Sequence, residues 1–399
     1  MKRILIFSHA LELGGAERSL LGLLDSIEYS QYAVDLFLMR HAGELLPYIN
    51  PQVHLLPEMP QYASLAVPMK EVLRKGQVGV AFGRLRGKYR AKQKRNMLGI
   101  SGEQGISLEY SHKYTVPFMP EIQPHTTYDL AVSFLTPHYF AAQKVRAKQY
   151  LAWIHTDYLA VQTDQKSEAA MWGRYDRIAS ISGSVSRSFI AVFPSLAPKI
   201  ISIENILAEK LIRMQAAGRE VSEEMPQNGA IRLLSVGRYC TAKNFDNVPD
   251  ICRRIREQGV NIQWYIIGFG GDETLIRRKI AEAGMEKHVI LLGKKENPYP
   301  YINACDVYVQ PSRYEGKCIS VREAQMLGKP VVITRYATSS SQLQDGVDGV
   351  IVPMENKGCA NALAKLLNEK ETLRRVAENT KNYDYSNRDE VQKLYRLME

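Results

Sequence analysis

The sequence lacks an apolar run that could cross a bilayer. No stretch approaches the roughly 18 consecutive apolar residues that a transmembrane helix needs. The first apolar run, residues 4–7, ends at Ser8 and is shorter than the roughly 7 to 15 apolar residues of a signal peptide. We therefore expect a cytoplasmic protein that is not an integral membrane protein.

Cysteine is scarce, and none of it is paired in sequence. The five cysteines are confined to the C-terminal part of the chain and form no Cys-x-x-Cys motif: Cys240, Cys252, Cys305, Cys318 and Cys359. Neither a disulfide framework nor a zinc clip is indicated, so we expect reduced thiols.

The composition is that of a folded globular protein. Hydrophobic residues make up 45% and charged residues 24% of the 399 residues. At roughly 100 to 200 residues per domain, this length favours two domains with full cores.

Acidic residues are nearly absent from one segment, which concentrates the positive charge of the chain. Residues 70–95 carry a charge of +9, out of a net charge of +10. The basic residues are Lys70, Arg74, Lys75, Arg84, Arg86, Lys88, Arg90, Lys92, Lys94 and Arg95, against the single acid Glu71. Because the charge is so local, the sequence does not favour an evenly basic surface that binds nucleic acid. It indicates one basic arm that is attracted to an anionic partner.

Apolar runs of strand length alternate with helical patterns along both halves of the chain. The predicted strands are residues 3–8, 33–39, 130–135, 150–155, 178–182 and 200–203, then 231–236, 263–267, 289–292, 307–310, 330–333 and 349–352. This alternation predicts an α/β protein with two parallel, Rossmann-like sheets and a ligand cleft between the two domains. We expect domains at residues 1–208 and 209–378, with a tail, 379–399, that crosses back to the first domain.

The most specific segment is Pro311-Ser312-Arg313-Tyr314-Glu315-Gly316-Lys317-Cys318-Ile319-Ser320-Val321-Arg322-Glu323. A strand ends before it, and a helix is predicted to begin near Ser320. The backbone amides at that helix start are suited to a phosphate, and Glu323 in the first turn is suited to accept hydrogen bonds from a ribose. Alternatively, Ser320 and Glu323 form a capping box.

The spacing of Glu315 and Glu323 is similar to the Glu-x7-Glu signature of the retaining glycosyltransferases of family 4, which have the GT-B fold. The following Glu-Ala-x-x-x-Gly-Lys-Pro-Val-Val also resembles that family. The sequence departs from the family at Lys317 and Cys318, where an aromatic residue followed by a small one is usual.

A second segment, Gly237-Arg238-Tyr239-Cys240-Thr241-Ala242-Lys243-Asn244, resembles the Gly-Arg and Lys-Asn elements of the same family. There, the arginine and lysine hold the diphosphate of the donor. Two fixed cations at a strand end can stabilise the negative charge that builds on a departing diphosphate. Alternatively, Arg238 and Lys243 are ordinary solvated charges of a loop.

Three shorter elements are similar to the family pattern. Gly268-Phe269-Gly270 resembles its Gly-x-Gly turn, and Gly14-Gly15 resembles its first loop; either is also explained as an ordinary turn. His155, at a strand end, resembles the family histidine near the donor sugar. For His9, also at a strand end, a structural role is the better interpretation.

The resemblance implies a metal-independent, retaining hexosyltransferase without a cofactor, since the Asp-x-Asp motif of GT-A enzymes is absent from the sequence. It transfers a sugar from a nucleotide-diphosphate sugar, by family preference a UDP-sugar, to a hydroxyl of a glycan or lipid-linked glycan in bacterial surface polysaccharide synthesis. The implied catalytic residues are Glu315, His155, Arg238 and Lys243. The implied donor-binding residues are Gly14, Gly15, Arg238, Lys243, Gly268, Gly316, Lys317, Cys318, Ile319, Ser320 and Glu323.

Other functions fit parts of the pattern. A GT-B nucleotide-sugar epimerase would need no acceptor, and a non-catalytic nucleotide- or polyanion-binding protein would bind without transfer. A glycosidase has no use for Arg238 and Lys243.

The basic arm itself is predicted to be a helix with a wide cationic face, because its basic residues recur at helical spacing. An apolar entry, residues 78–82, precedes the charges, as in helices that lie on anionic membranes. Aromatic residues are too sparse here for a base-stacking platform, so no nucleic acid is expected. A solvated charged surface is the alternative.

Overall fold

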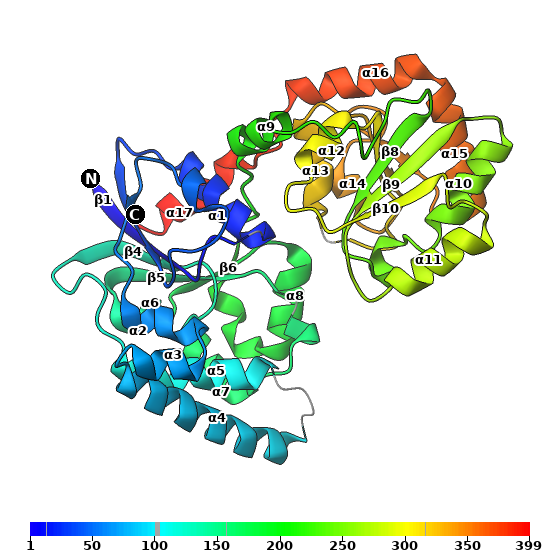
Figure 1. Cartoon of the computed structure of the whole chain (residues 1–399). Helices are drawn as coiled ribbons and strands as arrows, with labels where there is room; N and C mark the ends of the chain where they lie inside the picture. The colour runs from blue at the N-terminus through cyan, green and yellow to red at the C-terminus, as the bar shows by residue number, and fades with distance from the viewer. Residues whose placement is uncertain (13, 100–103, 157, 316) are drawn as a thin grey trace. The chain divides into compact units, whose positions relative to one another are not determined.

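The computed structural model describes residues 1–12, 14–99, 104–156, 158–315 and 317–399. The chain divides into two compact units, which Figure 1 shows. The N-terminal unit holds Met1–Leu207 together with Asn387–Glu399, and the C-terminal unit holds Ala208–Ser386.

In the described residues of the N-terminal unit, seven parallel strands form one sheet in the order β3-β2-β1-β4-β5-β6-β7. The strands are β1 (Lys2–Ser8), β2 (Tyr32–Leu38), β3 (His54–Leu55), β4 (Thr127–Ser133), β5 (Arg146–Ile154), β6 (Arg177–Ser180) and β7 (Ile200–Ser202). The helices are α1 (Gly15–Ser26), α2 (Pro60–Ala63), α3 (Met69–Arg74), α4 (Val78–Leu98), α5 (Gln104–Thr115), α6 (Ala141–Lys144), α7 (Gln165–Trp172), α8 (Gly183–Val192) and α17 (Val391–Arg396).

The C-terminal unit contains a second parallel sheet, with its six described strands in the order β10-β9-β8-β11-β12-β13. Its strands are β8 (Ile231–Val236), β9 (Ile262–Ile267), β10 (Val289–Gly293), β11 (Val307–Gln310), β12 (Val331–Thr334) and β13 (Val350–Val352). Its helices are α9 (Glu209–Ala217), α10 (Val248–Glu257), α11 (Glu273–Glu282), α12 (Tyr299–Ala304), α13 (Ile319–Met326), α14 (Ser339–Gln342), α15 (Asn356–Asn368) and α16 (Lys370–Asn379).

Both sheets have the doubly wound order in which the strand sequence reverses beside the first strand. The predicted α/β fold with two Rossmann-like domains is confirmed, and every predicted strand overlaps an observed one. The prediction missed β3, because a strand of two residues has no apolar run to reveal it. In sheets of this order, ligands bind outside the carboxyl ends of the strands at the reversal, here after β1 and β4 and after β8 and β11.

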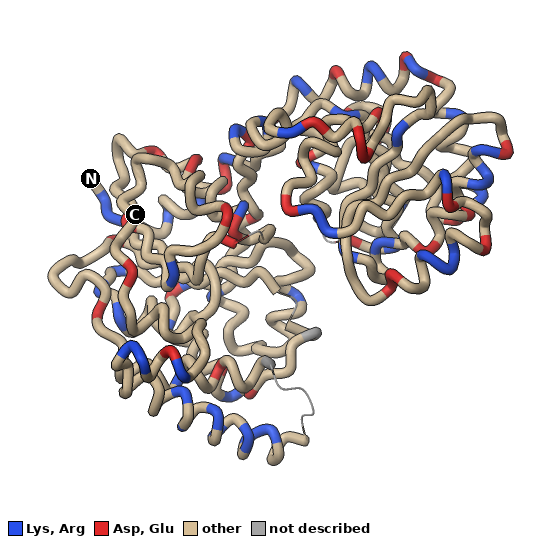
Figure 2. Tube along the Cα trace, in the orientation of Figure 1, with Lys and Arg blue, Asp and Glu red and all other residues tan. Residues whose placement is uncertain are grey.

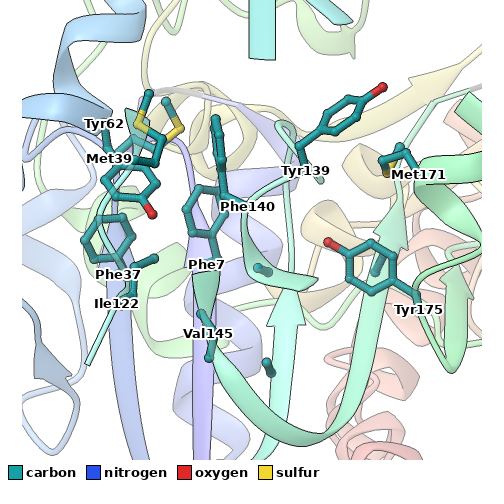
Figure 3. Close-up of a cluster of buried hydrophobic side chains, with 14 of the residues drawn as sticks. Phe7, Phe37, Met39, Tyr62, Ile122, Tyr139, Phe140, Val145, Met171 and Tyr175 are labelled. Atoms are coloured by element: carbon teal, nitrogen blue, oxygen red, sulfur yellow. The ribbon is translucent and has the colours of Figure 1, made fainter. Parts of the chain in front are cut away.

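Aromatic side chains fill the core of the N-terminal unit on one side of its sheet. Figure 3 shows Phe7, Phe37, Tyr62 and Phe140 gathered against each other. The ring centroids of Phe37 and Tyr62 lie 5.0 Å apart, and those of Phe7 and Phe37 lie 5.6 Å apart. Because β1 is buried from Ile4 onward, its apolar run is explained by packing on both faces.

The last helix, α17, packs on the N-terminal unit. The ring of Tyr395 stacks on that of Tyr32 at 4.0 Å between centroids, and its hydroxyl accepts a hydrogen bond from the Glu28 amide at 2.8 Å. Lys2 Nζ donates to the carbonyl of Met398 at 2.8 Å. The C-terminal residues are therefore tied to the first two strands.

Helix α4 contains the predicted cationic segment from residue 78 onward and runs along the outer edge of the N-terminal unit (Figure 1), whereas Lys70 and Arg74 belong to α3. Small residues recur every four positions on the face that meets α5. A side-chain carbon added at Gly83 would lie 2.7 Å from the Tyr114 carbonyl oxygen, and one added at Gly87 would lie 2.6 Å from that of Tyr110. Ala91 continues this face and is fully buried. Within the described parts of the chain, no helix combines the length and apolarity needed to cross a membrane.

We predict that Gly87→Leu destabilises the N-terminal unit, because the added side chain meets the backbone of α5. Overpacking of this kind costs about 1 to 3 kcal/mol, and removal of a helical glycine returns roughly 1 kcal/mol or less. Urea unfolding followed by circular dichroism measures the change, with Lys92→Leu on the exposed face of α4 as the matched control. Equal midpoints and slopes for the two variants would show that α4 does not depend on this close contact.

Candidate active site

Three loops of the C-terminal unit follow strands that meet at the reversal of its sheet. They come after β8, β9 and β11, and backbone contacts hold them together. The amide of Gly237 donates to the Ile267 carbonyl at 3.0 Å, and the amide of Tyr239 donates to the Phe269 carbonyl at 2.8 Å. Asn244 Nδ2 donates to the Pro311 carbonyl at 2.9 Å, which ties the loop after β8 to the loop after β11.

Gly268 is required by close packing between two of these loops. A side-chain carbon at this position would lie 1.9 Å from the carbonyl oxygen of Gly237. The loop after β9 can therefore approach the loop after β8 only because residue 268 has no side chain. Gly268 thus packs against the residues on either side of Arg238, Gly237 and Tyr239, while the side chain of Arg238 itself is exposed.

Lys243 and Glu315 form a mostly buried ion pair at the centre of this edge. Lys243 Nζ lies 2.5 Å from Glu315 Oε1, and the two side chains are only 17% and 11% exposed. Ser312 Oγ donates to the same carboxylate oxygen at 2.6 Å. Burial acts to lower the pKa of Lys243, but the neighbouring Cys318 and Glu315 outweigh it and raise that pKa above its usual value. Lys243 is therefore held as a cation.

The exposed guanidinium of Arg238 contrasts with Lys243. In the described ranges, no carboxylate forms an ion pair with Arg238. Arg238 follows β8 by two residues, and Lys243 ends the same loop. One cation of the predicted pair is thus open to solvent and the other is neutralised by Glu315.

The loop that leads into α13 is fixed by side chains of the same unit. The amide of Cys318 donates to Gln342 Oε1 at 2.7 Å, and Gln342 Nε2 donates back to the Cys318 carbonyl at 3.2 Å. Cys318 Sγ lies 3.7 Å from Lys243 Nζ and 3.2 Å from Ser320 Oγ. Lys317 is exposed, Ile319 begins α13, and Gly316 lies outside the described residues.

The capping-box interpretation of Ser320 and Glu323 is wrong. Helix α13 begins at Ile319, its N-cap is Cys318, and no side chain caps it. Instead, Glu323 is buried at 5% exposure and its Oε1 accepts a hydrogen bond from the Tyr299 hydroxyl at 2.7 Å. The carboxylate is therefore held by a neighbouring helix, α12, and the amides at the start of α13 receive no side-chain cap.

The remaining predicted residues belong to the N-terminal unit. Gly14 is the N-cap of α1 and Gly15 its first residue, and no side chain caps this helix either. His155 follows β5, with its ring 4.8 Å from that of Phe134. Burial lowers the pKa of His155 to about 4, so its imidazole is neutral near pH 7. The structure thus links Lys243, Glu315, Cys318 and Ser320 through contacts, whereas Gly14, Gly15 and His155 lie in the other unit.

Sequence reasoning assigned no role to three of the side chains that build this edge. Ser312 carried a signal, because it stands in the Pro-Ser pair before Glu315. Tyr299 and Gln342 carried none, since they come from α12 and α14 and reach the site only through the fold. Among the described residues, no group of three or more His, Cys, Asp and Glu side chains is arranged to hold a metal ion.

Part of this chain matches a known family. Residues 220–383 match the family described as "Glycosyl transferases group 1". A curated relative, the amylovoran biosynthesis glycosyltransferase AmsK of Erwinia amylovora, is 30% identical over 145 residues, 34% of this chain and 35% of the relative. The N-acetylgalactosamine-N,N'-diacetylbacillosaminyl-diphospho-undecaprenol 4-alpha-N-acetylgalactosaminyltransferase of Campylobacter jejuni is 27% identical over 148 residues, 37% of this chain and 40% of the relative. The match thus spans well under half the length of each relative.

Solved structures match the whole chain. HepE from Anabaena, solved in complex with UDP and glucose, superposes with a TM-score of 0.63 over 99% of both chains at 16% identity. At that identity the likeness establishes the fold. The chain has the GT-B fold, and its residues 220–383, which carry the Lys243–Glu315 pair, match the group 1 glycosyltransferases.

Proposed function

We propose that this protein is a retaining glycosyltransferase of the family 4 type, which transfers a sugar from a nucleotide-diphosphate sugar, by preference a UDP-sugar, to a hydroxyl of a glycan or lipid-linked glycan. The observation that carries the proposal is the buried Lys243–Glu315 pair beside the exposed Arg238, within the segment that matches the glycosyltransferase family. A fixed cation next to a fixed carboxylate suits a donor that joins a diphosphate to a hydroxyl-bearing sugar.

In this proposal, Arg238 and Lys243 hold the diphosphate. Breaking the bond between sugar and phosphate builds negative charge on the departing diphosphate, and two fixed cations stabilise that charge. The uncapped amides at the start of α13, at Ile319 and Ser320, can add hydrogen bonds to a phosphate. The close-packed Gly268 and the loop at Lys317 and Cys318 complete the donor site, with Gly14 and Gly15 on the other unit.

The two glutamates take different parts of the donor. Glu315 accepts hydrogen bonds from hydroxyls of the transferred sugar, and Glu323, fixed by Tyr299, accepts them from the ribose. Both carboxylates are buried, which favours hydrogen-bonded positioning over a role as a solvated charge.

The reaction needs no carboxylate base and no metal in this account. The departing phosphate takes the proton of the acceptor hydroxyl on the face from which it leaves, so the anomeric configuration is retained. The neutral imidazole of His155 orients the sugar, since a group with a pKa near 4 is a hydrogen-bonding partner and not a cation near pH 7.

The names of the relatives support a place in bacterial surface glycan synthesis. AmsK is named for amylovoran biosynthesis, and the Campylobacter jejuni relative is named for transfer to a diphospho-undecaprenol sugar. We extend these contexts to this chain as a proposal, with the enzyme on the cytoplasmic face of a membrane that carries its acceptor.

Helix α4 is the surface that we propose contacts an anionic membrane. Figure 2 shows Lys and Arg following one another along this helix, which contains no acidic residue. Arg86, Lys88, Arg90 and Lys92 are exposed. Arg84 and Lys94 are engaged within the unit: Arg84 donates to the carbonyls of Ser64 and Val67 at 2.8 and 2.7 Å, and Lys94 pairs with Asp164 at 3.3 Å.

Exposed apolar side chains share this helix with the exposed cations. Val78, Phe82, Leu85 and Tyr89 are 66%, 57%, 56% and 63% exposed, and their spacing of four, three and four residues places them on one face. Because the glycine face of α4 packs against α5, the stripe of apolar side chains faces away from α5. An apolar stripe beside cations, with no acid, fits the interface of an anionic leaflet.

We predict that Arg238→Ala and Lys243→Ala each weaken UDP binding without unfolding the protein. Loss of a charge-assisted hydrogen bond costs about 1.5 to 3 kcal/mol, which corresponds to roughly ten- to a hundredfold in affinity. Isothermal titration calorimetry measures the change, and Lys287→Ala, an exposed cation of the same unit, serves as the control. Wild-type UDP affinity in both variants would remove the diphosphate assignment.

We also predict that replacing Arg86, Lys88, Arg90 and Lys92 by Gln releases the protein from vesicles that contain phosphatidylglycerol. Each basic residue near an anionic leaflet contributes about 1 kcal/mol, so four of them change partitioning by roughly a thousandfold at low salt. Vesicle sedimentation measures the effect. The matched control replaces four exposed cations of the C-terminal unit, Lys370, Arg374, Arg375 and Lys381, by Gln.

UDP affinity should be unchanged in the α4 variant, since its four positions lie in the other unit from Arg238 and Lys243. Vesicle binding that is unchanged by both the α4 substitutions and added salt would contradict the membrane proposal. The helix would then be a solvated charged surface.

A further inference from the structure

A carboxylate in the segment between α9 and β8, residues 218–230, ties that segment to the loop after β10. Glu224 Oε1 lies 2.8 Å from Arg219 Nη2 and accepts a hydrogen bond from the Tyr301 hydroxyl at 2.6 Å. Glu224 Oε2 pairs with Lys295, which belongs to the loop between β10 and α12. The hydrogen bonds from Lys295 and Tyr301 hold the pKa of Glu224 below its usual value, so the carboxylate is ionised near pH 7.

A second tie joins the same part of the chain to the start of α12. Asn297 Nδ2 donates to the carbonyl of Gln215, in the last turn of α9, at 2.9 Å. The amide of Tyr299, the first residue of α12, donates to Asn297 Oδ1 at 3.1 Å. Helix α9 packs on α12 and on α13, as Figure 1 shows. Helix α12 is therefore held at its first residue and at its third, Tyr301, by residues that precede β8.

Helix α12 in turn holds Glu323. Tyr299 and Tyr301 are both 1% exposed, so their rings are fixed by packing. Two steps along an α-helix turn a side chain by roughly 200°, so the two rings point to opposite sides of α12. The Tyr301 hydroxyl meets Glu224, and the Tyr299 hydroxyl donates to Glu323 Oε1 at 2.7 Å. A displacement of α12 that begins on the Glu224 side therefore reaches Glu323.

The geometry of the first contact depends on Glu224. Because the Tyr301 ring is buried, loss of the carboxylate either leaves the hydroxyl without this acceptor or makes α12 shift toward water. Lys295 Nζ lies 5.3 Å from the centre of the same ring, so cation, ring and carboxylate form one cluster. Ligand-binding groups must be held to within about 0.5 Å of their productive positions, so a small shift of α12 is enough to affect binding.

We propose that Glu224 is a positioning residue for donor binding. It acts through α12 and without contact to the donor, and it keeps the carboxylate of Glu323 where the hydroxyls of the ribose bind. The inference rests on the proposed function, because that function assigns the ribose to Glu323. The segment that follows the passage of the chain from Leu207 into the C-terminal unit thereby contributes to nucleotide recognition.

Calorimetry with UDP and with 2′,3′-dideoxy-UDP tests the proposal, because the second ligand lacks the hydroxyls that are assigned to Glu323. The wild type should bind UDP about tenfold or more tightly than the dideoxy nucleotide. Glu224→Leu is similar in size and removes both acceptor oxygens. It should weaken UDP and leave the dideoxy nucleotide unchanged, so that most of the preference for UDP is lost.

Milder substitutions follow the same contacts. Tyr299→Phe removes the hydroxyl that holds Glu323, Tyr301→Phe removes the hydroxyl that meets Glu224, and both should reduce the preference for UDP. Glu224→Gln should lie between Glu224→Leu and the wild type, since an amide oxygen still accepts a hydrogen bond from Tyr301. Tyr265→Phe is the matched control. It removes one hydroxyl hydrogen bond on β9 of the same unit and should keep the full preference.

A merely structural role for Glu224 predicts a different result, because general loosening of the site weakens both nucleotides alike. The proposal is overturned if Glu224→Leu keeps the wild-type preference for UDP. Tyr301→Phe decides in the same way if Glu224→Leu does not fold. A wild type that binds both nucleotides equally also overturns it, since the ribose hydroxyls would then not be recognised. Failure of the proposed function is distinguishable, because the wild type would then bind neither nucleotide.

Discussion

The ion pair between Lys243 and Glu315 joins the two loops from which the C-terminal site is built. Lys243 comes from the segment after β8 and Glu315 from the segment after β11, and their contact is 2.5 Å long and mostly buried. Removing one partner of a buried pair leaves the other uncompensated, which typically costs about 3 to 5 kcal/mol. The loops therefore keep their spacing in the absence of a donor. A diphosphate that reaches Lys243 must share or replace Glu315, which leaves that carboxylate free to accept sugar hydroxyls.

The two units share one strand order but carry their cations in different places. At its sheet edge, the C-terminal unit offers the cations Arg238 and Lys243, to which we assign the diphosphate of the donor. The N-terminal unit carries exposed positive charge on α4, where Arg86, Lys88, Arg90 and Lys92 lie beside an apolar stripe.

Much of the fold could be predicted, because a parallel strand that is buried on both faces has a continuous run of apolar residues in its sequence. The run at residues 4–7 became β1 and that at 231–236 became β8. The Glu-x7-Glu spacing indicated the edge that carries the buried pair. The capping box failed because α13 begins one residue earlier than predicted, at Ile319, and because Tyr299 holds Glu323 from another helix.

Other features depend on contacts that no local pattern reveals. The charge count treated all of residues 70–95 alike, whereas Arg84 and Lys94 are bonded within the unit. The sequence alone does not explain Gly83 and Gly87 of α4, because their role is the close contact with α5, a helix that follows later in the chain.

Calorimetry on Glu315→Gln tests the central role of the ion pair most directly. The variant is titrated with UDP and with the UDP-sugar that the wild type binds most tightly. Because a glutamine side-chain oxygen can still accept hydrogen bonds from Lys243 and Ser312, the two loops stay joined, while Lys243 is no longer neutralised. UDP should therefore bind at least as tightly as to the wild type, while the UDP-sugar loses affinity. Equal weakening of both ligands would contradict the account, since the charge of Glu315 would then be needed for the nucleotide and not for the sugar.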